Sequence, residues 1–365
     1  MSKQSPKYLL VVDKLRKQIK EGKLTEQLPG ERVLAKEFGY SYMTIRKAIE
    51  TLVEEGILYK IPTKGTFVSD KSSARKETTV IGYFLDSSIV AGLTSPYYSL
   101  IFNALEKEAS RLGYSLLYFS DMGESATMNL MNKIDGVIVS CFPRIESLVA
   151  ELNQHVPVVT IDNQSSNQEI PSVGIDNFNA VSDCVDYLCK LGHTRIGFMT
   201  GLEDSNVGTN RYAGYIAGLK AHGKEVDDEL IYRGNYSFES GTKGADYFMA
   251  LQNPPTAIIC ANDTMAIAAI RKINVSGFSV PEDISVVGFD DITVASQITP
   301  PLTTVTAPIQ EVAQSATVML NKLIRNQPLE DKHVQLPASL IVRKTTANVR
   351  KLANAESLAQ GTTLA

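Results

Sequence analysis

The chain has 365 residues, a formal net charge of -4 and 44% hydrophobic residues, a composition typical of a globular protein with two or three domains. The charge is uneven. Residues 1–76 hold 16 Lys and Arg against 9 Asp and Glu, a balance of +7, and the other 289 residues hold 20 against 31, a balance of -11. A small basic segment joined to a large acidic one favours a protein whose N-terminal part binds a polyanion such as nucleic acid.

Several classes of protein are disfavoured by composition. The four cysteines form no CxxC pair and the four histidines are scattered, so we expect no zinc site, no disulfide framework and no cofactor. The N-terminus "MSKQSPKYLLVVDKLRKQ" has only a four-residue apolar run and predicts no signal peptide, and no run approaches a membrane span. We therefore expect a cytoplasmic protein with no membrane partner.

Residues 1–70 predict three helices followed by a β-hairpin. The first helix carries an apolar stripe from Leu9 to Ile19, and the second follows Pro29-Gly30, with Gly30 as its N-cap. The third is expected from Tyr42 to about Glu54, with Ser41 as its N-cap. Two β-rich runs flank residues 62–65, which form a basic tip. This order predicts a winged helix-turn-helix, which places its third helix in the major groove of DNA.

The third helix has one face suited to a core and one face suited to contact. Its apolar residues recur at helical spacing, and the opposite face offers Tyr42, Met43, Arg46 and Lys47 before the first acid, Glu50. Taken alone, this pattern is equally consistent with a solvated surface helix. In a winged helix, the same face would bind phosphates and base edges.

The stretch "LPGERVLAKEFGYSYMTIRKAIETLVEEGIL", followed by "KGTFV", resembles the DNA-binding domain of the GntR family of bacterial repressors over about residues 7–69. The resemblance implies that DNA is contacted by Arg32, Ser41, Tyr42, Thr44, Arg46 and Gly65. The exposed Lys47 and the hairpin-tip Lys64 complete the expected set. Two positions depart from the family pattern, because Ser is usual at residue 30 and Arg at residue 42. Tyr42 cannot make a bidentate guanine contact, so we expect a different base in the operator half-site. A surface salt bridge is the alternative role for Arg32 and Arg46.

We expect residues 71–79, part of the polar run "SDKSSARKETT", to form a flexible linker. Residues 80–347 alternate apolar strands with helices and predict a doubly wound parallel α/β body of two lobes. The expected lobes are about 80–178 with 308–330, and 179–307 with 331–347. The tail, 348–365, is either a short helix or disordered, and its few apolar residues favour disorder.

Polar residues follow several of the predicted strands. Ligands of open α/β sheets bind beyond the carboxyl ends of the strands, and Asp86, Asp162, Asn262, Asp263, Asp290 and Asp291 stand at such ends. Carboxylates and an amide that converge favour a neutral polyhydroxyl ligand. Asn262 or Asp263 can instead cap the following helix, and Asp290-Asp291 can instead form a turn.

The body resembles the effector domain of the LacI/GalR repressors over about residues 79–347, through segments in family order such as "IDGVIVS", "LGHTRIGFMTG", "PPTAIICANDTMAIAAI" and "VPEDISVVGFDD". The resemblance implies a sugar effector contacted by Asp86, Tyr97 or Tyr98, Asp162, Arg211, Tyr236, Asn262 and Asp290, with Arg211 bonding ring hydroxyls and Tyr236 stacking on the sugar. For each tyrosine, core or interface packing is the alternative role.

A GntR-type head on a LacI-type body is similar to the arabinose repressors of Gram-positive bacteria, so we take a pentose as the first effector to consider. Such a chain is expected to bind a near-palindromic double-stranded operator as a homodimer and to repress sugar-utilisation genes. Tyr98, Ile101, Phe102 and Leu105 are candidates for the dimer interface, with core packing as the alternative.

Two other functions use the same body. A cytosolic enzyme acting on sugars would fit the clustered carboxylates, but the chain has no correctly spaced GxGxxG, no GxSxG and no P-loop. A plain solute-binding protein is opposed by the basic head and the lack of a signal peptide. We therefore predict a transcription regulator and not an enzyme.

Overall fold

The computed structural model describes residues 7–20, 23–24, 26–54, 57–61, 65–68, 79–86, 91–120, 130–140 and 145–349. The chain divides into two compact units, Met1–Thr78 and Thr79–Ala365. The linker expected at 71–79 lies outside the described residues except for Thr79, and the tail expected at 348–365 does so beyond residue 349.

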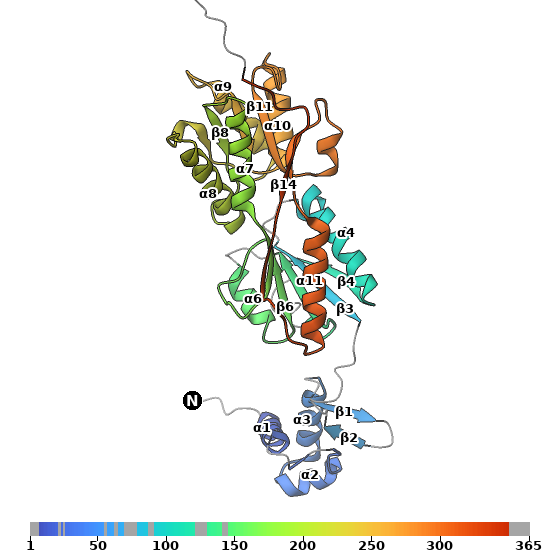
Figure 1. The fold of residues 1–365 in the computed structure, drawn as a ribbon. Helices are drawn as coiled ribbons and strands as arrows, with labels where there is room; N and C mark the ends of the chain where they lie inside the picture. Colours follow the sequence, from blue (N-terminus) through green and yellow to red (C-terminus); the bar gives the residue numbers. More distant parts are fainter. Residues whose placement is uncertain are drawn as a thin grey trace, which may run out of the picture. The chain divides into compact units, whose positions relative to one another are not determined.

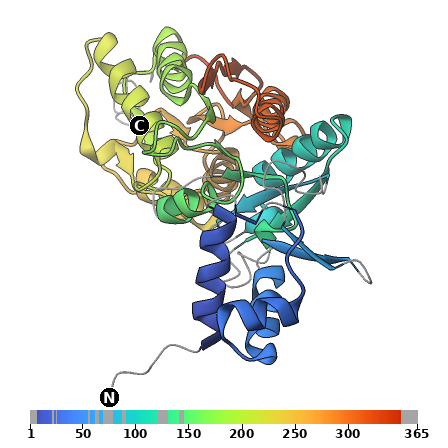
Figure 2. The same cartoon turned by 90° about the horizontal axis from the view of Figure 1, so that it is seen from below.

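Unit 1 is a winged helix-turn-helix, as predicted. Helices α1 (Lys7–Lys20), α2 (Glu31–Phe38) and α3 (Tyr42–Glu54) are followed by the antiparallel pair β1 (Leu58–Ile61) and β2 (Gly65–Val68). Figure 2 shows the hairpin extending to one side of the three helices. The apolar stripes of the helices meet in one core that includes Leu15, Leu34, Ile45 and Leu52.

The ends of the recognition helix follow the local signals in the sequence. Gly30 is the N-cap of α2, and Gly39 ends that helix with φ 71°, donating its N–H to Ala35. A left-handed residue at this position favours glycine. Ser41 Oγ then accepts a hydrogen bond from the backbone N–H of Thr44 at 3.2 Å, which caps α3 as predicted. The turn therefore fixes where the exposed face of α3 begins.

Unit 2 contains two six-stranded sheets (Figure 1). The first has the order β13-β7-β6-β5-β3-β4 and is parallel throughout. Its strands are β3 (Val80–Leu85), β4 (Ser115–Phe119), β5 (Gly136–Ser140), β6 (Val158–Ile161), β7 (Ser172–Ile175) and β13 (His333–Leu336). Helices α4 (Pro96–Arg111) and α11 (Ile309–Ile324) share one core with this sheet, and α6 (Glu146–Leu152) belongs to a second core. Successive strand residues belong to different cores, Tyr83 to the first and Phe84 to the second, because successive side chains point to opposite faces of the sheet.

The second sheet has the order β14-β12-β11-β10-β8-β9, in which only the edge strand β14 is antiparallel. Its strands are β8 (Ile196–Met199), β9 (Ile231–Tyr232), β10 (Ala257–Cys260), β11 (Ser285–Asp290), β12 (Thr303–Thr306) and β14 (Ser339–Ile341). Helices α7 (Asn177–Lys190) and α8 (Asn206–Ala221) pack in one core, and α9 (Phe238–Met249) and α10 (Asp263–Val275) pack in the other. Short helices η1 (Gly92–Thr94), η3 (Asp228–Leu230) and η4 (Thr293–Ser296) complete the described elements.

The chain passes between the lobes three times: between β7 and α7, between β12 and α11, and between β13 and β14. The last crossing corrects one predicted boundary. Residues 331–347 were assigned to the second lobe, but β13 pairs with β7, with His333 opposite Ser172, and so belongs to the first. A short edge strand carries no sequence signal for which of two similar sheets it joins.

The expected dimer face on α4 is only partly exposed. Ile101 and Leu105 are fully buried in the core of unit 2, whereas Tyr98 and Phe102 are partly exposed. The first two therefore have the alternative role, core packing, and are wrong as interface residues. Among the described residues no helix is both long enough and apolar enough to cross a membrane.

Candidate functional site

The expected DNA-contact residues of α3 form an exposed face of unit 1. Tyr42 and Met43 are 42% and 66% exposed, Arg46 and Lys47 are exposed, and Thr44 is partly exposed. Large apolar side chains exposed at the start of a helix favour a contact surface. The face thus combines exposed apolar and cationic side chains, as expected of a DNA-contact surface.

Two cations of this face already have partners on the protein. Arg46 Nε is 3.1 Å from Glu50 Oε1, one turn along α3, and this ion pair raises the pKa of the exposed guanidinium. Lys47 Nζ lies 4.6 Å from the centre of the Tyr8 ring. The surface salt bridge that was the alternative role for Arg46 is therefore present. It does not compete strongly with DNA, because exposed pairs contribute little.

The remaining predicted DNA contacts lie on α2 and on the hairpin. Arg32 is exposed on α2. Gly65 begins β2 with φ 125°, so the hairpin needs glycine for its backbone conformation. A Cβ there would also meet the end of the flexible Gln27 side chain at 2.7 Å. Lys64 lies outside the described residues.

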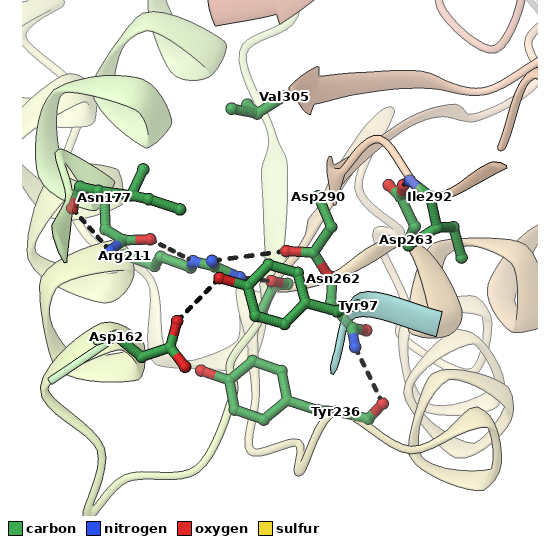
Figure 3. Close-up of polar contacts among 12 residues, drawn as sticks. Tyr97, Asp162, Asn177, Arg211, Tyr236, Asn262, Asp263, Asp290, Ile292 and Val305 are labelled. Carbon is green, nitrogen blue, oxygen red and sulfur yellow. Dashed lines mark hydrogen bonds and ion pairs between the residues drawn. The ribbon is translucent and has the colours of Figure 1, made fainter. Parts of the chain in front are cut away.

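In unit 2, the predicted effector residues come from both lobes, and Figure 3 shows six of them close together: Tyr97, Asp162, Arg211, Tyr236, Asn262 and Asp290. The first lobe supplies Asp86 after β3, Tyr97 and Tyr98 from the first turn of α4, and Asp162 after β6. The second supplies Arg211 from α8, Tyr236 before α9, Asn262 after β10 and Asp290 at the end of β11. The carboxyl ends of the two sheets therefore face each other, as the position of ligands in open α/β sheets requires.

Arg211 is the central cation of this site. Its Nε donates to Asn177 Oδ1 at 2.8 Å, its Nη1 donates to the backbone oxygen of Ala261, and its Nη2 is 3.6 Å from Asp290 Oδ1. The guanidinium carbon lies 3.5 Å from the centre of the Phe289 ring. These contacts hold a side chain that is only 4% exposed, and they fix the guanidinium in one orientation.

Asp162 is the corresponding acceptor of the first lobe. Its Oδ1 accepts a hydrogen bond from the Tyr97 hydroxyl at 2.8 Å. Its Oδ2 and the Tyr236 hydroxyl are both buried, and neither has a partner within hydrogen-bond distance among the described residues, although the Ser140 and Ser205 hydroxyls lie close enough to lower the pKa of Asp162 and of Tyr236 respectively. Buried polar atoms are nearly always bonded. One unsatisfied atom from each lobe therefore points to a ligand that supplies the missing partners.

Three residues of the site, and Asp291 beside them, have a strained backbone. Asp162, Tyr236, Asp290 and Asp291 have positive φ angles of 67°, 68°, 113° and 56°. Non-glycine residues rarely adopt this region, and each costs on the order of 1–3 kcal/mol. The protein therefore places these side chains at an energetic cost, which is typical of binding sites.

Burial raises the pKa of both site carboxyls. The pKa of Asp290 rises to about 7 because burial outweighs the opposing effect of the nearby Arg211 guanidinium. Burial also raises the pKa of Asp162, and the hydrogen bond from Tyr97 lowers it by a smaller amount. Burial also raises the pKa of Tyr97, Tyr98 and Tyr236, so these phenols remain protonated donors at neutral pH.

The structure separates Asp263 from the other predicted effector residues. Its carboxylate accepts hydrogen bonds from the Ile292 N–H at 2.9 Å and from the Thr304 hydroxyl, and no part of the residue is exposed. It therefore links α10 to the loop after β11, and we correct its assignment from ligand contact to structural support.

Asn262 and Asp86 also have structural contacts. Asn262 Oδ1 accepts from the Met265 N–H at 2.9 Å, so the alternative N-cap role is present, and its Nδ2 donates to the Tyr236 backbone oxygen at 3.1 Å. Asp86 is buried at the end of β3, and Tyr98 packs edge-on against Tyr97 with 5.2 Å between ring centres.

Two residues that hold Arg211 were missed by sequence reasoning. Asn177 follows the carboxyl end of β7, so it satisfies the same rule as the predicted residues, but strand β7 was not recognised. Phe289 lies one residue before Asp290 and resembles any other apolar strand residue. Only its stacking under the guanidinium shows its role. The described residues contain no cluster of three His, Cys, Asp or Glu side chains that could hold a metal ion.

Comparison with known proteins gives the family. Residues 7–68 match the model of bacterial regulatory proteins of the gntR family, and residues 185–346 match the periplasmic binding protein-like domain. The HTH-type transcriptional repressor CytR of Escherichia coli (strain K12) is 33% identical over 270 residues, which cover 71% of this chain and 78% of CytR. The chain belongs to the LacI family of transcriptional repressors. Its DNA-binding domain is of the GntR type.

Solved structures agree with this assignment. The repressor is similar to a transcriptional regulator LacI from Bacillus cereus subsp. cytotoxis NVH 391-98, with a TM-score of 0.68 and 27% identity over 74% of this chain and 99% of that one. It also shares its fold with the transcriptional regulator CelR in complex with cellobiose, with a TM-score of 0.67 and 23% identity over 87% of this chain and 100% of that one. The repressor's relatives are transcription regulators and not enzymes.

Proposed function

We propose that this repressor controls genes for the use of a sugar, and that the sugar binds between the two lobes of unit 2. The observation that carries the proposal is the pair of buried, unsatisfied atoms, Asp162 Oδ2 from one lobe and the Tyr236 hydroxyl from the other. A ring hydroxyl can donate to the first and accept from the second. A ligand so placed binds both lobes at once and favours their closed arrangement.

The lobes also contact each other directly next to this site. The Val207 N–H at the start of α8 donates to Asn163 Oδ1 at 3.2 Å, and Asn163 is adjacent to Asp162. Ligand binding and lobe closure therefore share one small region. A ligand that binds the closed state more tightly than the open state shifts the population toward the closed state. The size of the shift is set by the difference between the two affinities.

The DNA side of the proposal rests on the exposed face of α3. We propose that Arg32, Ser41, Tyr42, Thr44, Arg46, Lys47, Lys64 and Gly65 contact a near-palindromic operator, two copies of unit 1 binding as parts of a homodimer. The protein would act in the cytoplasm, and sugar binding would release the operator. A pentose is the first effector to test, from the likeness to arabinose repressors and a ribose-bound LacI family regulator from Enterococcus faecium of the same fold.

Two measurements test the proposal. A thermal-shift screen of the full chain against unphosphorylated mono- and disaccharides should give a saturable rise with one sugar, since a ligand that binds only the native state stabilises it. That sugar should then lower operator affinity in a mobility-shift titration. A stabilising sugar without any effect on operator binding would contradict the regulatory role. A plain solute-binding protein would give this second outcome.

A further inference from the structure

The charges of the effector site restrict the chemistry of its ligand. Each nitrogen of Arg211 already faces an acceptor of the protein, namely Asn177, the Ala261 carbonyl or Asp290, and one face of the guanidinium is covered by Phe289. A phosphate or carboxylate ligand needs a cation with free donors. These acceptors use only part of the five N–H groups of Arg211, so an anionic ligand would have to share the guanidinium with Asn177, Ala261 and Asp290.

Another cation near the end of β11, Arg343, is already paired with Asp291 at 2.7 Å. The ionisable groups of the site, Asp162, Asp290 and Tyr236, each have Arg211 as the one positive charge that acts on their pKa. Asp162 and Asp290 supply two carboxyls against this single guanidinium. An anion placed here would be desolvated beside two carboxyl groups and repelled by each of them once it is ionised, which for Asp290 means above about pH 7.

The unsatisfied atoms point the same way. Asp162 Oδ2 is an acceptor, and it requires a donor from the ligand. A sugar hydroxyl supplies that donor, whereas a phosphate dianion or a carboxylate has only acceptors. Asp162 Oδ2 therefore favours a ligand hydroxyl over an anionic group at this position.

We infer that the effector is an uncharged sugar, and that its phosphate ester and its sugar acid are excluded by the Asp162–Asp290 pair. This inference rests on the proposed sugar-sensing function. It also places the sensor in a reaction sequence. A kinase that transfers the γ-phosphoryl group of ATP to a sugar hydroxyl, giving the sugar phosphate, ADP and a proton, consumes the effector. The repressor then responds to the sugar before phosphorylation.

The sequence offers one cation that needs a separate test. Arg144 follows strand β5 by four residues and lies outside the described residues. If a sugar phosphate bound through Arg144, then Arg144→Ala would abolish that binding. The variant belongs in the experiment for this reason.

The test uses the full chain and matched pairs of ligands, for example D-ribose with D-ribose 5-phosphate, D-glucose with D-glucose 6-phosphate, and L-arabinose with L-arabinonate, with inorganic phosphate alone as a further probe. Calorimetry should show the neutral member of the responding pair binding at least about 100-fold more tightly, about 2.7 kcal/mol. Equal or tighter binding of the phosphate, lost in Arg144→Ala, overturns the inference but keeps the sensor function. Intact operator binding with no response to either class overturns both.

A charge variant tests the cause of the discrimination. Asp162→Asn keeps the shape and tolerates the left-handed φ of 67°, but removes one negative charge. We expect the neutral sugar to bind more weakly and the preference over its phosphate to shrink by about tenfold or more. Asp228→Asn, which removes an exposed carboxylate on η3, should leave the preference unchanged. An unchanged preference in Asp162→Asn would contradict the proposed role of its charge.

Discussion

The ring of Tyr236 occupies the space that a side chain at residue 201 would need. A Cβ placed on Gly201 would lie 2.0 Å from Tyr236 Cζ and 2.1 Å from its hydroxyl oxygen, so only glycine leaves the ring in this position. Gly201 follows strand β8 and has no positive φ. Its glycine is therefore required for space and not for backbone conformation.

Gly201→Ala should consequently displace the Tyr236 ring and weaken effector binding by at least about tenfold, ~1.4 kcal/mol. The measurement is a double-mutant cycle with Tyr236→Ala, using calorimetry with the responding sugar. In the Tyr236→Ala background, Gly201→Ala should cause no further loss of sugar affinity. The departure from additivity then measures the coupling between Gly201 and Tyr236. Additive losses would mean that Gly201 acts through another contact.

Arg211→Ala should abolish the response to sugar and also destabilise unit 2. Removing one partner of a buried ion pair leaves an uncompensated group, a loss of about 3–5 kcal/mol, here offset in part by protonation of Asp290. Urea unfolding and effector titration are the two measurements. Operator binding without sugar should persist under conditions where the variant is folded.

Arg211→Lys is the matched control for this variant. It keeps the charge but cannot reach Asn177, Ala261 and Asp290 together, so we expect stability between those of the wild type and the alanine variant, with weak effector binding. Full effector binding by the lysine variant would show that charge alone, and not the fixed fork of the guanidinium, is needed.

Arg46→Ala should weaken operator binding and leave sugar affinity unchanged. Loss of one phosphate contact lowers the slope of log affinity against log salt by about 1, and mobility-shift titrations at several salt concentrations measure it. The ion pair with Glu50 that is lost contributes little to the helix, because both side chains are exposed. Glu50→Gln is the control, because it breaks the same pair and retains the cation. If both variants weaken DNA binding equally, the pair itself is what matters.

Stability should depend on pH through Asp290. Its pKa is raised from 3.8 to about 7 in the folded protein, so the folded state binds more protons than the unfolded state between these values. Its contribution to the free energy of unfolding is therefore complete below about pH 4 and is lost as the pH rises through about 7. Thermal unfolding of the wild type and Asp290→Asn across pH 4 to 8 measures the difference. A difference that is constant over this range would contradict the raised pKa.

Much of the local structure was predictable from the sequence. The recognition helix spans Tyr42–Glu54 and the first strand of unit 2 spans Val80–Leu85, as expected from apolar spacing, the Ser41 cap and a continuous apolar run. These signals act within one turn or one strand. Strands β7, β13 and β14 are short and lack such a signal, so their pairing was not foreseen.

A winged helix-turn-helix joined to a LacI-type body was predictable from the residues alone, because helix spacing, caps and strand runs are local and the family segments are contiguous. The sequence also placed Asp162, Arg211 and Asp290 at strand ends or on a helix near one site. Their roles depend on contacts between distant residues, which form only in the folded protein. The Tyr97–Asp162 bond spans 65 residues and the Arg211–Asn177 bond spans 34. Whether a carboxylate such as Asp263 is satisfied by the core, or one such as Asp162 retains an unpaired oxygen, depends on partners that the folding of both lobes brings together.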